Sequence, residues 1–257
     1  MLGQAYTASG IAYQVAVAID VAALVGGGLG LSNLLRDRGV PRSVARYAAP
    51  WCAGAAFLIA ALWLEAGVAI ALAVLLTGML VALKAFRRTA LRGVEGELAS
   101  QSQSEITFGL AEVASLAIGW GWLGDPWLGF LPLAFMAWGD STAGLARATL
   151  WRSNVTSMWP SLGMAVVCLG AAFLYQPYWI GAVGAVAASI AERKRPRLGV
   201  WWDDNANVVA VSLIAMAALT FFVSKIQTHI WQARRRPSDL VRPLHGGPCP
   251  CRCSVIP

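Results

Sequence analysis

The stretch GVAIALAVLLTGMLVAL, Gly67–Leu83, contains no charged side chain. A helix rises about 1.5 Å per residue, so this run covers most of a bilayer core that is about 30 Å thick. Lipid cannot satisfy backbone N–H and C=O groups, and an unbroken run rich in Ala, Leu and Gly therefore predicts a membrane helix. Similar apolar stretches lie at Ile11–Leu35, Tyr47–Leu64, Ile106–Leu123, Trp127–Ala146, Leu162–Tyr175, Tyr178–Ala191 and Val208–Val223.

The composition agrees with a membrane protein along most of the chain. Of the 257 residues, 58% are hydrophobic and 13% are charged, whereas soluble domains contain roughly 25% charged residues. We predict an all-α, polytopic transmembrane helical bundle with about seven to eight spans. The sixth and seventh stretches are short, so they either tilt or form a re-entrant pair. The predicted membrane domain covers residues 1–224.

Residues 225–257 are predicted to be a basic tail that contains Cys and Pro and is disordered. The tail holds Cys249, Cys251 and Cys253. Metal binding is an alternative for these cysteines, but the C-x-C-x-C spacing lacks the C-x-x-C pairs that are usual in zinc sites.

The net charge of +7 raises the question of nucleic-acid binding, which the positions of the charges disfavour. Fourteen of the 20 Lys and Arg residues occur in alternate connections, at Arg36–Arg46, Lys84–Arg92, Arg147–Arg152 and Arg193–Arg197. This alternation follows the positive-inside rule and predicts that these loops lie on the cytoplasmic or equivalent face. The predicted location is therefore a prokaryotic plasma membrane or an organelle membrane, with no nucleic-acid partner.

Acidic and amide side chains occur where the apolar stretches meet these basic loops. Asp140 lies inside the fifth stretch, Asp203-Asp204-Asn205 precedes the eighth, and Glu105 and Glu192 border the fourth and seventh. A carboxylate within the bilayer costs about 2.5–3.5 kcal/mol or more, so membrane proteins that contain one usually use it. Carboxylates beside phosphates suit Mg²⁺, and Lys and Arg suit the phosphates themselves. Helix capping is the alternative for the residues that precede the eighth stretch.

Two further acids lie within apolar stretches. Asp20 is midway along the first stretch, and Glu112 is about two turns into the fourth. Each could form an interhelical hydrogen bond, line a proton or substrate path, or contact the hydroxyl group of a lipid alcohol. The interhelical hydrogen bond is the favoured interpretation for Glu112, and for Asp20 the alternatives are balanced.

The residues from Glu105 to Ala218 resemble the polyprenol kinase family, which includes dolichol kinases, phytol and farnesol kinases and CTP-dependent diacylglycerol kinases. The resemblance begins with Ser104-Glu105 at the start of a span, followed by GDSTAGL at Gly139–Leu145, which is similar to the family's G-D-x-x-A-x-[LIV]. Thr156-Ser157 before Ser161 resembles a K-[ST]-x-x-G-S segment, and Glu192 followed by Asp203-Asp204-Asn205 resembles E…D-[DN]-N. Arg147, Trp151 and Pro160 stand where the family pattern has glycines, and Thr156 stands where it has Lys. An expected R-K-x-x-H element has at most Arg46 as a remnant, with Pro50 in the place of His.

The resemblance implies an enzyme that transfers the γ-phosphate of a nucleotide, commonly CTP, to a lipid alcohol such as phytol, farnesol or dolichol. Together with the charge pattern, it leads us to predict a site that uses Mg²⁺. The predicted catalytic residues are Asp140, Asp204 and Glu105, and the predicted metal ligands are Asp140, Asp203, Asp204 and Glu192. The predicted nucleotide contacts are Gly139, Arg147, Arg152, Ser157, Lys194 and Asn205. The alternatives are a lipid cytidylyltransferase and a non-catalytic carrier or scaffold.

Overall fold

The computed structural model describes residues 8–86, 104–150, 158–194 and 204–235. Within these ranges every regular element is helical, as the sequence predicts, and there is no strand. The α-helices are α1 (Ala8–Asp37), α2 (Arg42–Ala45), α3 (Ala48–Trp63), α4 (Ala66–Phe86), α5 (Ser104–Ser115), α6 (Pro126–Ala134), α7 (Ser141–Thr149), α8 (Trp159–Ala172), α9 (Tyr178–Lys194) and α10 (Asp204–Arg235). Two π-helical segments interrupt them, η3 (Leu116–Trp122) and η4 (Phe135–Asp140).

Each of the eight predicted apolar stretches coincides with a helix or with a continuous run of helical segments. Four of these are long and apolar enough to cross a membrane: Gly10–Asp37, Arg42–Trp63, Ala66–Phe86 and Asn205–Thr228. The helices Ile106–Trp122 and Trp159–Ala172 are apolar but shorter. Large apolar side chains are exposed along these helices, among them Leu75, Val166 and Ile214, each at least 65% exposed. Such exposure is expected where a helix faces lipid.

The chain divides into two compact units, Met1–Leu219 and Thr220–Pro257. The predicted tail begins at residue 225, but the last helix continues to Arg235. The segment from Lys225 to Arg235 contains neither Gly nor Pro, and it therefore has no residue that strongly opposes helix continuation. The three tail cysteines lie outside the described residues.

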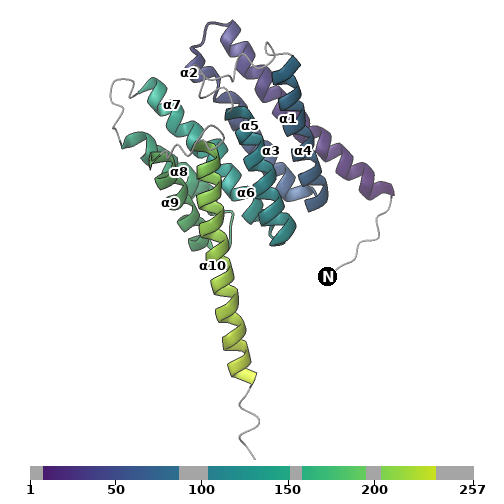
Figure 1. The fold of residues 1–257 in the computed structure, drawn as a ribbon, viewed down its shortest axis with the longest axis vertical. Coiled ribbons are helices and arrows are strands. Elements are labelled where there is room, and N and C mark those ends of the chain that lie inside the picture. Colours follow the sequence, from purple (N-terminus) through teal and green to yellow (C-terminus); the bar gives the residue numbers. More distant parts are fainter. Residues whose placement is uncertain (1–7, 87–103, 151–157, 195–203, 236–257) are drawn as a thin grey trace, which may run out of the picture. The chain divides into compact units, whose positions relative to one another are not determined.

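Within the first unit, α1 packs mainly against α3, and α8 packs against α9 (Figure 1). Small residues of α3, including Ala56 and Ala60, contact Val17 and Val21 of α1 in one apolar cluster. Small side chains allow helix backbones to approach closely, which is the usual basis of packing between membrane helices.

The run α6–η4–α7 is the most buried part of the first unit. Phe130, Leu131, Leu133 and Phe135 are completely buried, and α6 or η4 contacts α3, α5, α8 and α9. This central run contains the GDSTAGL segment, so Asp140 belongs to a helical run that packs against four other helices.

Candidate functional site

The central run changes from α-helical to π-helical hydrogen bonding just before Asp140. Pro132 lies inside α6, where it cannot donate a backbone hydrogen bond. Side chains from outside the π-helical segment that follows donate to two of its carbonyl oxygens. The Cys168 thiol donates to that of Phe135 at 3.9 Å, and the Thr142 hydroxyl donates to that of Trp138 at 2.6 Å. π-Helical turns occur frequently at functional sites. This one ends at Asp140, whose side chain makes no capping hydrogen bond to α7.

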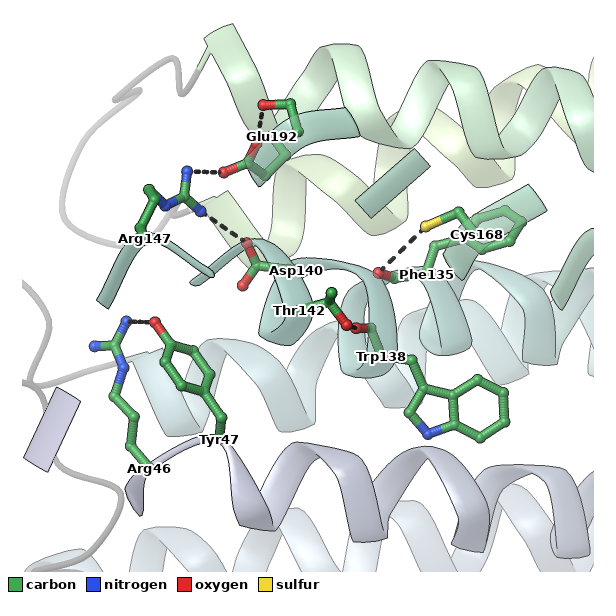
Figure 2. A network of polar contacts seen from close by, with 10 residues as sticks. Arg46, Tyr47, Phe135, Trp138, Asp140, Thr142, Arg147, Cys168 and Glu192 are labelled. Atoms are coloured by element: carbon green, nitrogen blue, oxygen red, sulfur yellow. Dashed lines mark hydrogen bonds and ion pairs between the residues drawn. The ribbon is translucent and has the colours of Figure 1, made fainter. Parts of the chain in front are cut away.

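Asp140, Arg147, Ser161 and Glu192 form a polar cluster in which Arg147 joins the two acids. Arg147 Nη1 donates to Glu192 Oε1 at 2.5 Å, and Arg147 Nη2 lies 3.9 Å from Asp140 Oδ1. The Ser161 hydroxyl donates to Glu192 Oε2 at 3.1 Å. Figure 2 shows the Arg147 guanidinium between the carboxylates of Asp140 and Glu192. The cluster therefore unites the end of η4 with α7, α8 and α9.

The two acids of the cluster have different surroundings. The Glu192 side chain is 0% exposed, whereas those of Asp140 and Arg147 are 19% and 28% exposed. Both Glu192 oxygens accept hydrogen bonds, from Arg147 and Ser161. A buried carboxylate is tolerated when it is paired and hydrogen-bonded in this way. Glu192 thus positions Arg147, and Asp140 is the partly exposed carboxylate of the two.

A second arginine lies beside the cluster, at the junction of α2 and α3. Arg46 Nη2 donates to the Tyr47 hydroxyl at 2.7 Å, and Figure 2 shows Arg46 and Arg147 on the same side of Asp140. A β-carbon added to Gly144 would overlap the Tyr47 phenol. Gly144 therefore lets the buried Tyr47 ring lie directly against α7. The sequence analysis did not identify Tyr47, because an aromatic residue at a span end resembles an ordinary interfacial residue.

Gly139, a predicted nucleotide contact, packs closely against α8 in the structure. Gly139 is buried, and a β-carbon there would overlap Cys168 and crowd Met164 of α8. The absent side chain allows α8 to approach the central run closely. Since α8 occupies this space, a phosphate has no access to Gly139 from that side.

A hydrogen bond from the Asn207 side chain links the start of α10 to the end of α9. Its side-chain amide donates to the Ala191 carbonyl oxygen at 3.1 Å, one residue before Glu192. Asn205, a predicted nucleotide contact, is buried on the first turn of α10. The sequence analysis missed Asn207, although the repeated Asn in DDNAN was a possible signal.

The other predicted site residues are described incompletely or not at all. Glu105, Lys194 and Asp204 lie on the described backbones of α5, α9 and α10, but their side chains are outside what the structure describes. The predicted residues Arg152, Ser157 and Asp203 also lie outside the described residues.

Among the described side chains, no group of three or more His, Cys, Asp or Glu is placed to hold a metal ion. Within that part of the chain, the Arg147 guanidinium stands between Asp140 and Glu192 and supplies the positive charge there. Glu192, a predicted metal ligand, is buried here, and its two oxygens accept hydrogen bonds from Arg147 and Ser161. Asp140, which is partly exposed, suits that role better.

The cluster has the groups that phosphate chemistry uses. Arg147 can donate to anionic oxygens, while Asp140 can accept a proton or contact a cation. Its partly exposed members are Asp140 and Arg147, and the buried Glu192 pairs with Arg147. A scan against protein-family models and searches of curated proteins and of solved structures found no match to this chain.

Proposed function

We propose that the chain is a membrane-embedded kinase that transfers the γ-phosphate of a nucleotide, with CTP favoured, to an isoprenoid alcohol such as phytol, farnesol or dolichol. The observation that carries the proposal is the cluster of Asp140, Arg147, Ser161 and Glu192 at the end of a buried π-helical turn. Ionic groups are costly to desolvate in an apolar bundle, so a membrane protein that contains them usually uses them. The sequence resemblance to polyprenol kinases supplies the reaction class.

In this proposal each member of the cluster has a separate task. Asp140, together with Asp203 or Asp204, would hold Mg²⁺, which would supply positive charge to the nucleotide phosphates. Arg147, positioned by Glu192, binds a phosphate oxygen and offsets the charge that develops during transfer. Asp140 or another carboxylate of the site accepts the proton of the attacking hydroxyl group. Most of the catalysis then comes from positioning and charge neutralisation.

We further propose about eight spans, with the active face cytoplasmic. Support comes from the helical run at each apolar stretch and from the basic loops at alternate connections. The helix α8 has 14 residues, which corresponds to roughly 21 Å at the usual helical rise. Because a bilayer core is about 30 Å thick, α8 and α9 either cross as tilted, short spans or form a re-entrant pair, which would lower the number of spans.

One observation favours a second candidate function, that of a non-catalytic carrier or scaffold. Arg147 stands where the resemblance leads us to expect glycine, and its guanidinium already pairs with Glu192 and Asp140. A cluster whose acids are already paired with Arg147 could stabilise the bundle without binding nucleotide. The two functions differ in whether Mg²⁺ and CTP together stabilise the folded protein.

The deciding experiment uses membranes that contain the full chain, a panel of prenyl alcohols, and CTP labelled on either its γ- or its α-phosphate. Transfer of γ-label to the alcohol supports the kinase. Transfer of α-label indicates a cytidylyltransferase instead, and no transfer by folded protein, with no stabilisation by Mg²⁺ and CTP, supports the carrier.

The variant Asp140→Asn should abolish the transfer while the protein remains folded. Asp125→Asn is the matched control, because Asp125 caps the opposite end of the same helical run through its bond to the Trp127 N–H at 2.9 Å. Asn caps helices about as well as Asp, so the control should keep its activity. Full activity of Asp140→Asn would exclude the proposed role of Asp140.

A further inference from the structure

Arg46 and Tyr47 form the short connection between α2 and α3, beside the cluster around Asp140. Arg46 Nη2 donates to the Tyr47 hydroxyl at 2.7 Å, and the guanidinium carbon lies 4.8 Å from the centre of the Tyr47 ring. Among the described residues, Arg46 makes no ion pair with a carboxylate. A guanidinium has several N–H donors, so Arg46 keeps donors and a charge with which to bind another group.

The Tyr47 hydroxyl is the buried polar group of this connection. Tyr47 is 9% exposed, and its hydroxyl oxygen accepts from Arg46, but in the described part of the chain its own proton has no acceptor. A phenol can accept and donate at the same time. Because Arg46 donates to the oxygen, the O–H of Tyr47 points elsewhere and is strengthened as a donor. The hydroxyl therefore suits an anionic acceptor.

The central run brings this donor to the ionic groups of the cluster. Asp140, Gly144 and Arg147 follow one another at spacings of four and three residues, so they lie on the same side of α7. The Tyr47 hydroxyl lies against Gly144, where an added β-carbon would overlap it. Tyr47 also interacts electrostatically with both Asp140 and Arg147. Figure 2 shows its hydroxyl beside Arg46 and directed toward Asp140 and Arg147.

Two guanidinium groups and one phenol O–H therefore offer donors on one side of Asp140. Guanidinium and hydroxyl groups are common donors to phosphate oxygens. A bare anion would be repelled by the partly exposed Asp140 carboxylate. A polyphosphate chain avoids this repulsion, because it brings its own Mg²⁺, which a carboxylate can hold beside the phosphates. Mg²⁺-bound polyphosphate thus fits both the donors and the acid.

We propose that Arg46 and the Tyr47 hydroxyl bind a phosphate oxygen of the donor nucleotide, next to the phosphate that Arg147 binds. This inference rests on the proposed kinase function and deepens it, because it assigns the second half of the phosphate site to the connection between α2 and α3. Both contacts go to the phosphate chain and neither goes to the base. Inorganic tripolyphosphate, which has no base, should therefore make them as well as CTP does.

The test measures how Mg²⁺ and tripolyphosphate inhibit the transfer of γ-phosphate from CTP in membranes that contain the full chain. Tyr47→Phe removes the hydroxyl and keeps the ring, and Arg46→Met removes the charge and keeps the apolar stem. Each should raise the KM for CTP and the inhibition constant of tripolyphosphate by about ten-fold or more, the effect of one hydrogen bond to a charged group. The KM for the prenyl alcohol should not change.

Tyr178→Phe is the matched control. The Tyr178 hydroxyl also accepts a side-chain hydrogen bond, from Gln176 at 3.0 Å, but Tyr178 begins α9 and lies at the opposite end of that helix from Glu192. Its replacement should leave both constants unchanged. If the inhibition constant of tripolyphosphate is the same in Tyr47→Phe and Arg46→Met as in the wild type, the inference is wrong even where the wild type proves to be a kinase.

A wild type that transfers no phosphate would contradict the proposed function, and the phosphate site is then tested by binding alone. Mg²⁺ with tripolyphosphate should raise the melting midpoint of the wild type and of Tyr178→Phe, but not that of Tyr47→Phe or Arg46→Met. Equal stabilisation of all four proteins, or none of the wild type, would overturn the inference. Stabilisation by farnesyl phosphate alone would also overturn it, because the site would then hold a lipid phosphate.

Discussion

Replacing Arg147 by Leu removes a cation that pairs with the wholly buried Glu192 carboxylate. Glu192 would keep its hydrogen bond from Ser161 but lose the positive charge of Arg147. Breaking a buried ion pair on one side costs about 3–5 kcal/mol, because a buried charge is left uncompensated. Coulomb's law agrees, since two unit charges about 4 Å apart at an effective dielectric constant of about 20 interact by roughly 4 kcal/mol.

The assay is thermal unfolding of the purified protein in detergent. For a chain of this size about 1 kcal/mol corresponds to roughly 2–4 °C, so Arg147→Leu should lower the midpoint by about 6–20 °C. Adding Glu192→Gln should restore most of this loss, because the double variant buries no charge. Arg38→Leu is the control: Arg38 is exposed, and its replacement should change stability by no more than about 0.5 kcal/mol.

Two results would refute this reasoning. The first is an unchanged midpoint in Arg147→Leu, which would mean that the guanidinium does not compensate the Glu192 charge. The second is a double variant that is no more stable than Arg147→Leu alone, because the loss would then come from missing packing of the Arg147 side chain.

Three further substitutions should lower the same midpoint. Ser161→Ala removes a hydrogen bond to the charged Glu192 and should lower the free energy of unfolding by about 1.5–3 kcal/mol, less than Arg147→Leu. An equal or larger loss would contradict the view that the ion pair contributes more than this hydrogen bond. Gly144→Ala places a methyl group on the Tyr47 phenol and should lower the free energy of unfolding by about 1–3 kcal/mol through overpacking. Adding Tyr47→Leu should recover part of this loss, and no recovery would argue against the contact. Asn207→Ala leaves the buried Ala191 carbonyl without its side-chain donor and should lower the free energy of unfolding by about 1–3 kcal/mol. An unchanged midpoint would show that water replaces the amide.

Most of the helices could be predicted from the sequence, because the constraint that produces them acts on each segment alone. An apolar run such as Gly67–Leu83 must satisfy its own backbone in lipid, and it does so as the helix α4. The number of membrane crossings could not be obtained in the same way. A 14-residue helix such as α8 is too short to decide by itself whether it crosses, and its partner α9 influences the outcome.

The candidate site was predicted less completely than the fold. Asp140 was identified because a carboxylate in an apolar stretch has a high cost that is visible in the sequence. The pairing of Arg147 with Glu192 was not predicted, since 45 residues separate them. Gly139 was assigned to nucleotide binding from the motif around it, but its neighbour in space is Cys168.

The sequence alone determined that this protein is helical, that much of it is apolar enough for a membrane, and which acids are unusual there. These properties depend on residue composition and on interactions within one helix. Tertiary structure decided the partners of these acids: Arg147 pairs with both Glu192 and Asp140, and Ser161 donates to Glu192. Such partnerships depend on which helices pack together, and packing is decided by small residues and side-chain shapes on several helices at once.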